Sequence, residues 1–240
     1  MSRISDGPQV WLVIPAFEVA DSLPRLLEQS AQYIPAVRTI VVDDGSDDGT
    51  VLAAGRMVAQ VIRHERNLGK GAALQTGLRQ ARANGAEWAV TLDGDLQHSP
   101  AHLPEFIAAA ASGRADLALG ARRRRGTPMP YDRRLSNWLS SGVVSLVAGF
   151  RIPDAQCGYR LIRLSLWEKV RAAAPRYDYE TELLLEIAAM GGRIDSIPIS
   201  TVYQGENSSI YRLRDTLLFA RTVFRHGLRR LFRPKSFARP

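Results

Sequence analysis

Short apolar segments alternate with longer amphipathic segments through the first half of the 240-residue chain. We expect strands at residues 10–14, 39–42, 58–63, 88–92 and 117–119, and helices at residues 22–30, 48–54, 70–84 and 103–111. This alternation is typical of βαβ units, whose strands form a mostly parallel sheet. The sequence therefore predicts an α/β fold in which a mostly parallel central sheet is flanked by helices.

Length and composition favour one domain rather than two. A chain of 240 residues with 45% hydrophobic residues can bury one full core. Its single cysteine, Cys157, allows no internal disulfide and fits a reducing compartment. No apolar run approaches the roughly 20 residues of a membrane span, and no cleavable leader is visible at the N-terminus. We expect a cytoplasmic protein that is neither secreted nor membrane-spanning.

Two carboxylates, Asp93 and Asp95, follow the predicted strand at 88–92 with one glycine between them. Carboxylates held this close usually need a cation, and oxygen ligands suit Mg²⁺ or Mn²⁺, which keep open positions for a bound diphosphate. A solvated Asp-Gly turn is the plainer interpretation of such a pair on its own. The neighbouring loops favour the metal, because polar loops also follow the first two strands, and ligands of open α/β sheets bind at that edge.

The second loop, residues 43–50, is acidic, and the segment at 67–77 complements it. Carboxylates accept hydrogen bonds, so Asp44 is a candidate for binding a nucleotide base or ribose, while Asp47 or Asp48 can cap the following helix. Gly69, Lys70 and Gly71 begin a predicted helix, where an anion can be bound. The spacing matches neither a P-loop nor a dinucleotide-binding fingerprint. Lys70 is therefore expected to meet a nucleotide, with an ordinary helix start as the alternative.

Together, and in this order, these segments resemble the family 2 glycosyltransferases of GT-A fold, in particular the dolichyl-phosphate mannosyltransferase and polyprenyl-phosphate sugar transferase branch. The resemblance covers about residues 10–210 and includes residues 154–160, which are similar to an Asp-x-x-x-Gly-Phe-Arg element. It implies a Rossmann-like GT-A domain at 1–210. It also implies a nucleoside site formed by Pro15, Ala16, Phe17, Glu18 and Asp44, and a metal and diphosphate site formed by Asp93, Asp95 and Gln97.

The resemblance further implies an acceptor site. Arginines near the predicted strand at 117–119, together with a serine, would bind an acceptor phosphate, and the matching residues are Arg122, Arg134, Ser136 and Arg160. A solvated basic loop is the plainer interpretation of the arginine run at 122–125. The family also has a carboxylate in an aromatic-x-x-Glu setting, for which Glu180 and Glu182 both qualify.

The implied reaction is an inverting transfer of a sugar from a UDP- or GDP-sugar to a lipid acceptor, most simply a polyprenyl phosphate. The metal would neutralise the leaving diphosphate, and Asp95 is the main catalytic candidate. A lipid phosphate is already ionised, so it needs no strong general base. A hydroxyl acceptor on a glycan or glycolipid is the alternative, and Asp154, Glu180 or Glu182 would then be the base.

A basic amphipathic helix is expected at residues 211–232, before a disordered tail at 233–240. Such a helix can lie on the cytoplasmic face of an anionic membrane, or it can dock on its own domain by the same stripe. That apolar stripe consists of Leu213, Leu217, Ala220, Phe224, Leu228 and Leu231.

The net charge of +8 also suggests a nonenzymatic membrane- or nucleic-acid-binding protein. We rank this class low and expect no nucleic acid partner, because the predicted site is acidic. The oligomeric state is left open.

Overall fold

The computed structural model describes residues 7–122, 131–172, 174–200 and 212–231, with the backbone alone at 131–135, 212–215 and 230–231. A seven-stranded sheet forms its centre, in the order β3-β2-β1-β4-β6-β5-β7. β6 runs antiparallel to both of its neighbours, and the other pairs are parallel. The strands are β1 (Val10–Ala16), β2 (Thr39–Asp43), β3 (Gln60–Arg63), β4 (Trp88–Thr91), β5 (Leu117–Arg122), β6 (Arg160–Arg163) and β7 (Ile194–Ile199). The predicted mostly parallel α/β sheet is confirmed, with β6 and β7 as strands that the sequence did not predict.

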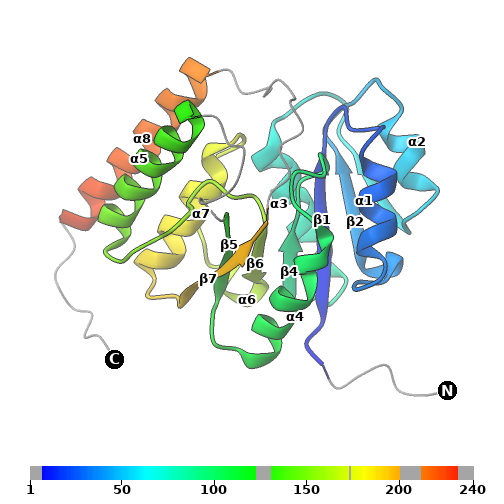
Figure 1. Cartoon of the computed structure of the whole chain (residues 1–240), viewed down its shortest axis with the longest axis horizontal. Coiled ribbons are helices and arrows are strands. Elements are labelled where there is room, and N and C mark those ends of the chain that lie inside the picture. Colours follow the sequence, from blue (N-terminus) through cyan, green and yellow to red (C-terminus); the bar gives the residue numbers. More distant parts are fainter. Residues whose placement is uncertain (1–6, 123–130, 173, 201–211, 232–240) are drawn as a thin grey trace.

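Helices cover both faces of this sheet (Figure 1). They are α1 (Leu23–Ser30), α2 (Thr50–Gly55), α3 (Lys70–Ala83), α4 (Leu103–Ser112), α5 (Tyr131–Ala148), α6 (Leu164–Trp167), α7 (Asp178–Ala189) and α8 (Arg212–Leu231), with short 3₁₀ turns at Ala36–Arg38 and Pro100–His102. The helices predicted at 22–30, 48–54, 70–84 and 103–111 are confirmed as α1 to α4, and α8 lies within the range predicted for the C-terminal helix. The sequence predicted no helix over the range of α5. The tail predicted at 233–240 lies outside the described residues.

Side chains alternate between two cores along each central strand. In β1, Leu12 and Ile14 join α1 and α4 in one core, while Trp11 and Val13 join α3 and α7 in the other. Strands buried on both faces read as continuous apolar runs, which is why the sequence identified them. Gly77 lets α3 approach closely, since a Cβ there would lie 2.4 Å from Val13 Cγ1. The first residue of α3, Lys70, is thereby held at the carboxyl edge of the sheet.

The C-terminal helix α8 packs on α7 and α5 rather than extending from the domain (Figure 1). Thr222, Val223 and His226 are buried in this contact, and Arg229 Nη1 lies 2.9 Å from Glu186 Oε1 of α7. Arg225 pairs in the same way with Glu182. Among the described helices, none contains a stretch long and apolar enough to cross a bilayer.

The docked face of α8 is not the stripe that the sequence indicated. Within the described part of that stripe, Leu217 is 69% exposed, Phe224 68% and Leu228 39%, and Ala220 is exposed as well. Of the two alternatives left open by the sequence, docking on the domain through this same stripe does not fit the exposure of its described residues. A second face, which contains Thr222, Val223 and His226, docks instead, because its polar groups find partners on α7.

Candidate active site

Three loops that follow β1, β2 and β4 meet at one edge of the sheet. The backbone N–H of Glu18 donates to Ser46 Oγ at 2.9 Å, which joins the first loop to the acidic loop. Ser22 Oγ donates to the carbonyl of Gly94 at 2.7 Å, which joins the first loop to the loop after β4. The expected convergence of these loops is confirmed, because parallel strands end at the same edge.

Asp93 lies at one end of a mostly buried network of ion pairs. Lys70 Nζ is 2.7 Å from Asp93 Oδ1 and 3.1 Å from Glu180 Oε2. Glu180 Oε1 in turn lies 3.7 Å from Arg160 Nε. The side chains of Lys70, Asp93 and Glu180 are 15%, 26% and 8% exposed, so Asp93 is the most accessible of the three. The structure therefore brings together four predicted site residues from α3, the β4 loop, α7 and β6.

The network keeps Lys70 and Asp93 charged. Burial lowers the pKa of Lys70, but the carboxylates of Asp93 and Glu180 outweigh it and raise the pKa above its ordinary value. Burial raises the pKa of Asp93, but Lys70, and less strongly His98 and Arg160, lower it below its ordinary value. A carboxylate at this position is therefore ionised at neutral pH.

Gly158 closes this network on one side. A Cβ at Gly158 would lie 2.5 Å from Asp93 Oδ2 and 2.8 Å from Lys70 Nζ, closer than real side chains approach. Its carbonyl accepts a hydrogen bond from Thr91 Oγ1 at 2.8 Å, which fixes the 154–160 element beside β4. The sequence identified this element but not the contact of Gly158 with Asp93 and Lys70, because that contact joins residues far apart in the chain.

Asp95 and Gln97, the other predicted metal ligands, lie in the same loop as Asp93. The backbone N–H of Gln97 donates to Asp95 Oδ1 at 3.0 Å, and both residues are half-buried. Within the described residues, no group of three or more His, Cys, Asp or Glu side chains is placed to hold a metal ion. Two carboxylates nevertheless fit Mg²⁺ or Mn²⁺ when phosphates and water complete the ligand set. The roles of Asp93, Asp95 and Gln97 as metal ligands stay predictions.

Asp44 is buried and holds the backbone that precedes α3. Its Oδ1 lies 2.7 Å from His64 Nδ1 and accepts from the N–H of Leu68 at 3.0 Å, and its Oδ2 accepts from the N–H of Gly69 at 2.7 Å. Asp44 therefore orients the turn that carries Lys70. Its contact with a nucleotide base stays a prediction. The sequence did not single out His64, because nothing in its local pattern shows that it faces the acidic loop.

The first loop contributes both buried and exposed residues to the predicted nucleoside site. Pro15 and Ala16 are buried at the end of β1, whereas Phe17 and Glu18 are exposed. Glu18 has a φ of 52°, in the left-handed region, which turns the chain toward the acidic loop. Phe17 and Glu18 thus present side chains to solvent at the edge of the sheet, and the roles of all four residues stay predictions.

Arg122 and Asp154 pair with each other. Arg122 Nε and Nη2 donate to the two carboxylate oxygens of Asp154 at 2.5 and 2.8 Å, and the two side chains are only 14% and 7% exposed. Burial raises the pKa of Asp154, but Arg122 outweighs it and lowers the pKa below its ordinary value. Asp154 is consequently a weak proton acceptor in this arrangement.

Arg160 is turned into the protein rather than toward an acceptor. The residue is 1% exposed, and its guanidinium donates to the carbonyls of Cys157, Ala155 and Glu180 at 2.6 to 2.8 Å. A direct contact with an acceptor phosphate, as predicted, does not fit this placement, because the donors are already used inside the protein. Arg160 instead supports the 154–160 element and the start of α7.

The remaining acceptor candidates lie on α5. Ser136 is exposed there, and the side chain of Arg134 lies outside the described residues. The predicted set therefore divides into Arg122 and Arg160, which are buried in ion pairs, and Ser136, which faces solvent. No contact among the described residues joins Ser136 to the others, so its role stays a prediction.

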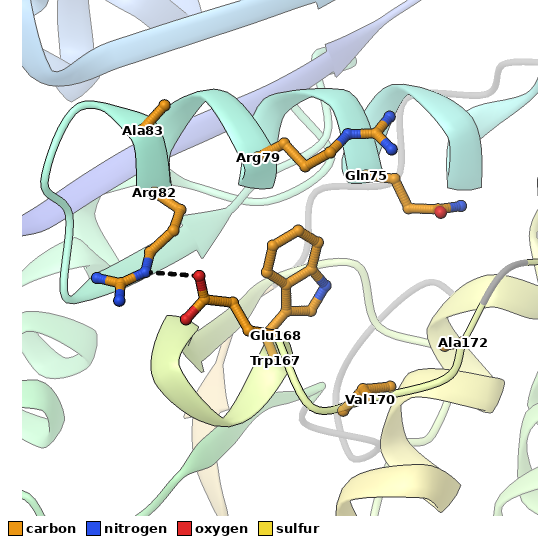
Figure 2. Close-up of a pocket in the computed structure, with 8 residues that line it drawn as sticks. All are labelled: Gln75, Arg79, Arg82, Ala83, Trp167, Glu168, Val170 and Ala172. Atoms are coloured by element: carbon orange, nitrogen blue, oxygen red, sulfur yellow. Dashed lines mark ion pairs between the residues drawn. The ribbon is translucent and has the colours of Figure 1, made fainter.

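Two cavities flank α3. One, of about 630 Å³, is lined by Arg63, His64, Glu65, Arg66 and Leu68, and it adjoins Asp44 through His64. The other, of about 830 Å³, lies between α3 and residues 167–172, where Arg82 pairs with Glu168 at 3.0 Å (Figure 2). None of the predicted site residues lines either cavity, but His64 of the first cavity contacts Asp44, whereas the second cavity has no such link among the contacts of its described lining residues. We therefore place the candidate site at the strand ends and not in the cavity of Figure 2.

Comparison with known proteins identifies the class. A family model described as glycosyl transferase family 2 matches residues 11–171. Undecaprenyl-phosphate mannosyltransferase of Micrococcus luteus is 29% identical over 205 residues, which cover 81% of this chain and 84% of that protein. Polyprenol monophosphomannose synthase of Mycolicibacterium smegmatis is 27% identical over 201 residues, which cover 79% of this chain and 76% of that protein.

A solved structure shares the fold. Glucosyl-3-phosphoglycerate synthase from Mycobacterium tuberculosis, in complex with Mn²⁺, UDP and phosphoglyceric acid, aligns with a TM-score of 0.72 at 20% identity and covers 96% of this chain and 81% of that chain. The sheet and its converging loops are thus those of a GT-A glycosyltransferase. The chain belongs to glycosyl transferase family 2, which confirms the resemblance found in the sequence.

Proposed function

We propose that the protein transfers a sugar from a nucleoside-diphosphate sugar to a polyprenyl phosphate. The observation that carries the acceptor is the state of the three carboxylates eligible as general bases. Asp154 is held by Arg122, Glu180 by Lys70 and Glu182 by Arg225. A hydroxyl acceptor would need a base that is free to take its proton, whereas an ionised phosphate does not. The names of the two relatives described above, undecaprenyl-phosphate mannosyltransferase and polyprenol monophosphomannose synthase, support the same acceptor.

The donor site of this proposal lies at the edge formed by the loops after β1, β2 and β4. The cavity beside His64 and Asp44 offers space for the nucleoside. In this placement the diphosphate would lie against the loop that carries Asp93 and Asp95. Asp93, Asp95 and Gln97 would hold Mg²⁺ or Mn²⁺, which would neutralise charge on the leaving diphosphate. UDP-sugars and GDP-sugars are both candidate donors. The reaction would invert the anomeric carbon by in-line displacement, as the family resemblance implies.

The test supplies Mn²⁺ or Mg²⁺, a panel of UDP- and GDP-sugars, and undecaprenyl phosphate in detergent. We expect release of UDP or GDP that depends on the lipid phosphate and equals the glycolipid formed. Undecaprenol, which has the same chain and a free hydroxyl, is the matched control and is expected to give no release. Turnover with undecaprenol or a glycan, and none with the lipid phosphate, would contradict the proposed acceptor.

The proposal also places the protein at the cytoplasmic face of an anionic membrane. The exposed stripe of α8 contains Leu217, Phe224 and Leu228, and exposed Trp138, Leu139 and Leu146 lie on α5. The two helices touch, since a Cβ on Gly227 would lie 3.7 Å from Val147 Cγ2. Residues 136–150 and 216–231 include no Asp or Glu, and α8 carries arginines. An apolar and basic face of this kind suits anionic headgroups.

Replacing Leu217 and Phe224 together with serine is expected to reduce binding to phosphatidylglycerol vesicles at least tenfold. Each large apolar side chain contributes about 1.5–3 kcal/mol when it leaves water completely, and a tenfold change needs about 1.4 kcal/mol. Leu52→Ser is the control, because Leu52 is 71% exposed on α2, away from this face. Co-sedimentation with vesicles measures all three proteins. Equal binding of the double variant and wild type would exclude α8 as the membrane contact.

A further inference from the structure

Asp93 already has a cation in this structure, namely the ammonium group of Lys70. The two groups are 2.7 Å apart, and Glu180 holds the same ammonium from its other side at 3.1 Å. A lysine between two carboxylates of which one is only 8% exposed is a fixed counter-ion rather than a solvated surface charge. The Asp93 carboxylate is therefore neutralised before any ligand arrives.

The surroundings leave little space for a second cation beside Lys70. Asp93 Oδ1 is occupied by Lys70, and Oδ2 lies against the backbone of Gly158, where even a Cβ would be 2.5 Å away. A divalent ion bound to Asp93 would lie within a few ångströms of the ammonium, and like charges at that separation repel strongly. Binding at Asp93 therefore requires that Lys70 move.

A bound diphosphate would give Lys70 a place to move to. Lys70 is the first residue of α3 and has a flexible stem with three donors, which suits a phosphate as well as a carboxylate. The helix N-terminus itself is partly used, because the N–H of Ala72 donates to Pro175 O at 2.9 Å. The lysine side chain is thus the cationic group at this helix end that can be transferred to the ligand.

We propose that Lys70 is the resident counter-ion of Asp93 and moves to the donor's diphosphate when the donor binds. Each of the two ligands, the divalent cation and the nucleotide, therefore binds the protein more tightly when the other is already bound. This proposal rests on the proposed function, since it takes the ligand to be a nucleoside diphosphate. It also agrees with the absence, among the described residues, of three metal-ligating side chains in one group. Lys70 is a positioning residue in this role.

The test measures Mn²⁺ binding by electron paramagnetic resonance, with and without UDP or GDP, and needs no catalytic turnover. For wild type we expect weak binding of Mn²⁺ alone and at least tenfold tighter binding with the nucleotide that fits. Lys70→Met removes the charge and keeps the stem, so we expect it to bind Mn²⁺ alone at least tenfold more tightly than wild type, with a smaller effect of nucleotide. Arg79→Met, an exposed position on the same helix, is the control and is expected to match wild type.

Lys70→Gln provides a second variant if Lys70→Met does not fold, and the same result is expected of it. Wild-type affinity for Mn²⁺ in the folded Lys70 variant, with an unchanged effect of nucleotide, would overturn the role of Lys70 and leave the proposed function intact. If neither UDP nor GDP tightens Mn²⁺ binding by wild type, the proposed donor class fails as well. The two failures are therefore distinguishable.

Discussion

Replacing Asp95 with asparagine is expected to lower the turnover of the nucleotide sugar by a factor of about 10²–10³. Loss of one group that stabilises developing charge in a transition state has an effect of this size. Asparagine keeps the side-chain oxygen that accepts the N–H of Gln97, so the loop should keep its conformation. Turnover is measured by nucleoside diphosphate release, and thermal unfolding confirms that the variant is folded.

Asp47→Asn is the matched control for the charge change. Asp47 lies in the acidic loop, but its side chain is 97% exposed and lies 3.9 Å from Arg63, so an exposed pair of this kind contributes little. We expect turnover and stability of this variant to equal those of wild type. If Asp95→Asn also keeps wild-type turnover, the cation is not held through Asp95 and the assignment of this loop is incorrect.

β1, β2, β4 and most of β5 could be predicted because their side chains are buried on both faces of the sheet, which makes their apolar runs nearly continuous. β3 is only partly buried and was predicted from a shorter apolar segment. The bounds of all five strands differ from the predicted ones by a few residues at most. β6 could not be predicted in this way, since it is four residues long with an arginine at each end. Arg160 is buried there by ion pairs, and Arg163 lies over the Trp88 ring at 4.6 Å. These two arginines interrupt the apolar pattern that would otherwise predict a strand inside the sheet.

β7 and α5 were missed for different reasons. β7 contains Asp195 and Pro198 and lies at the edge of the sheet, where proline is tolerated and alternation is weak. α5 keeps Trp138 and Leu146 exposed, so its apolar residues do not form the single buried stripe by which a helix on a domain is recognised.

The candidate site could be predicted loop by loop but not contact by contact. The order of strands places Asp44, Asp93 and Lys70 at one edge, and this followed from the sequence. The pairs Lys70–Asp93 and Arg122–Asp154 did not, because each joins residues from different elements whose separation only the fold determines. As a result, the sequence analysis assigned to ligand binding several side chains that form ion pairs with each other in the structure.

Replacing Arg160 with methionine is expected to lower the free energy of unfolding by about 3–5 kcal/mol, the usual cost of removing one partner of a buried ion pair. Methionine fills much of the space but leaves the carbonyls of Ala155 and Cys157 without their donor. It also removes the donor to the carbonyl of Glu180, at the start of α7. Urea unfolding followed by circular dichroism measures the change.

Arg163→Met in the same strand separates burial from the loss of an arginine as such. The Arg163 side chain is 31% exposed and pairs with Asp116 at 3.2 Å, so we expect its replacement to cost about 1 kcal/mol or less. If Arg160→Met does not fold, Arg160→Lys keeps the charge with fewer donors and is expected to fall between wild type and the methionine variant. Equal losses of unfolding free energy in the Arg160 and Arg163 variants would mean that the buried network around Arg160 stabilises the protein no more than a surface ion pair does. Lys70 and Asp93 would then not depend on this network for their positions.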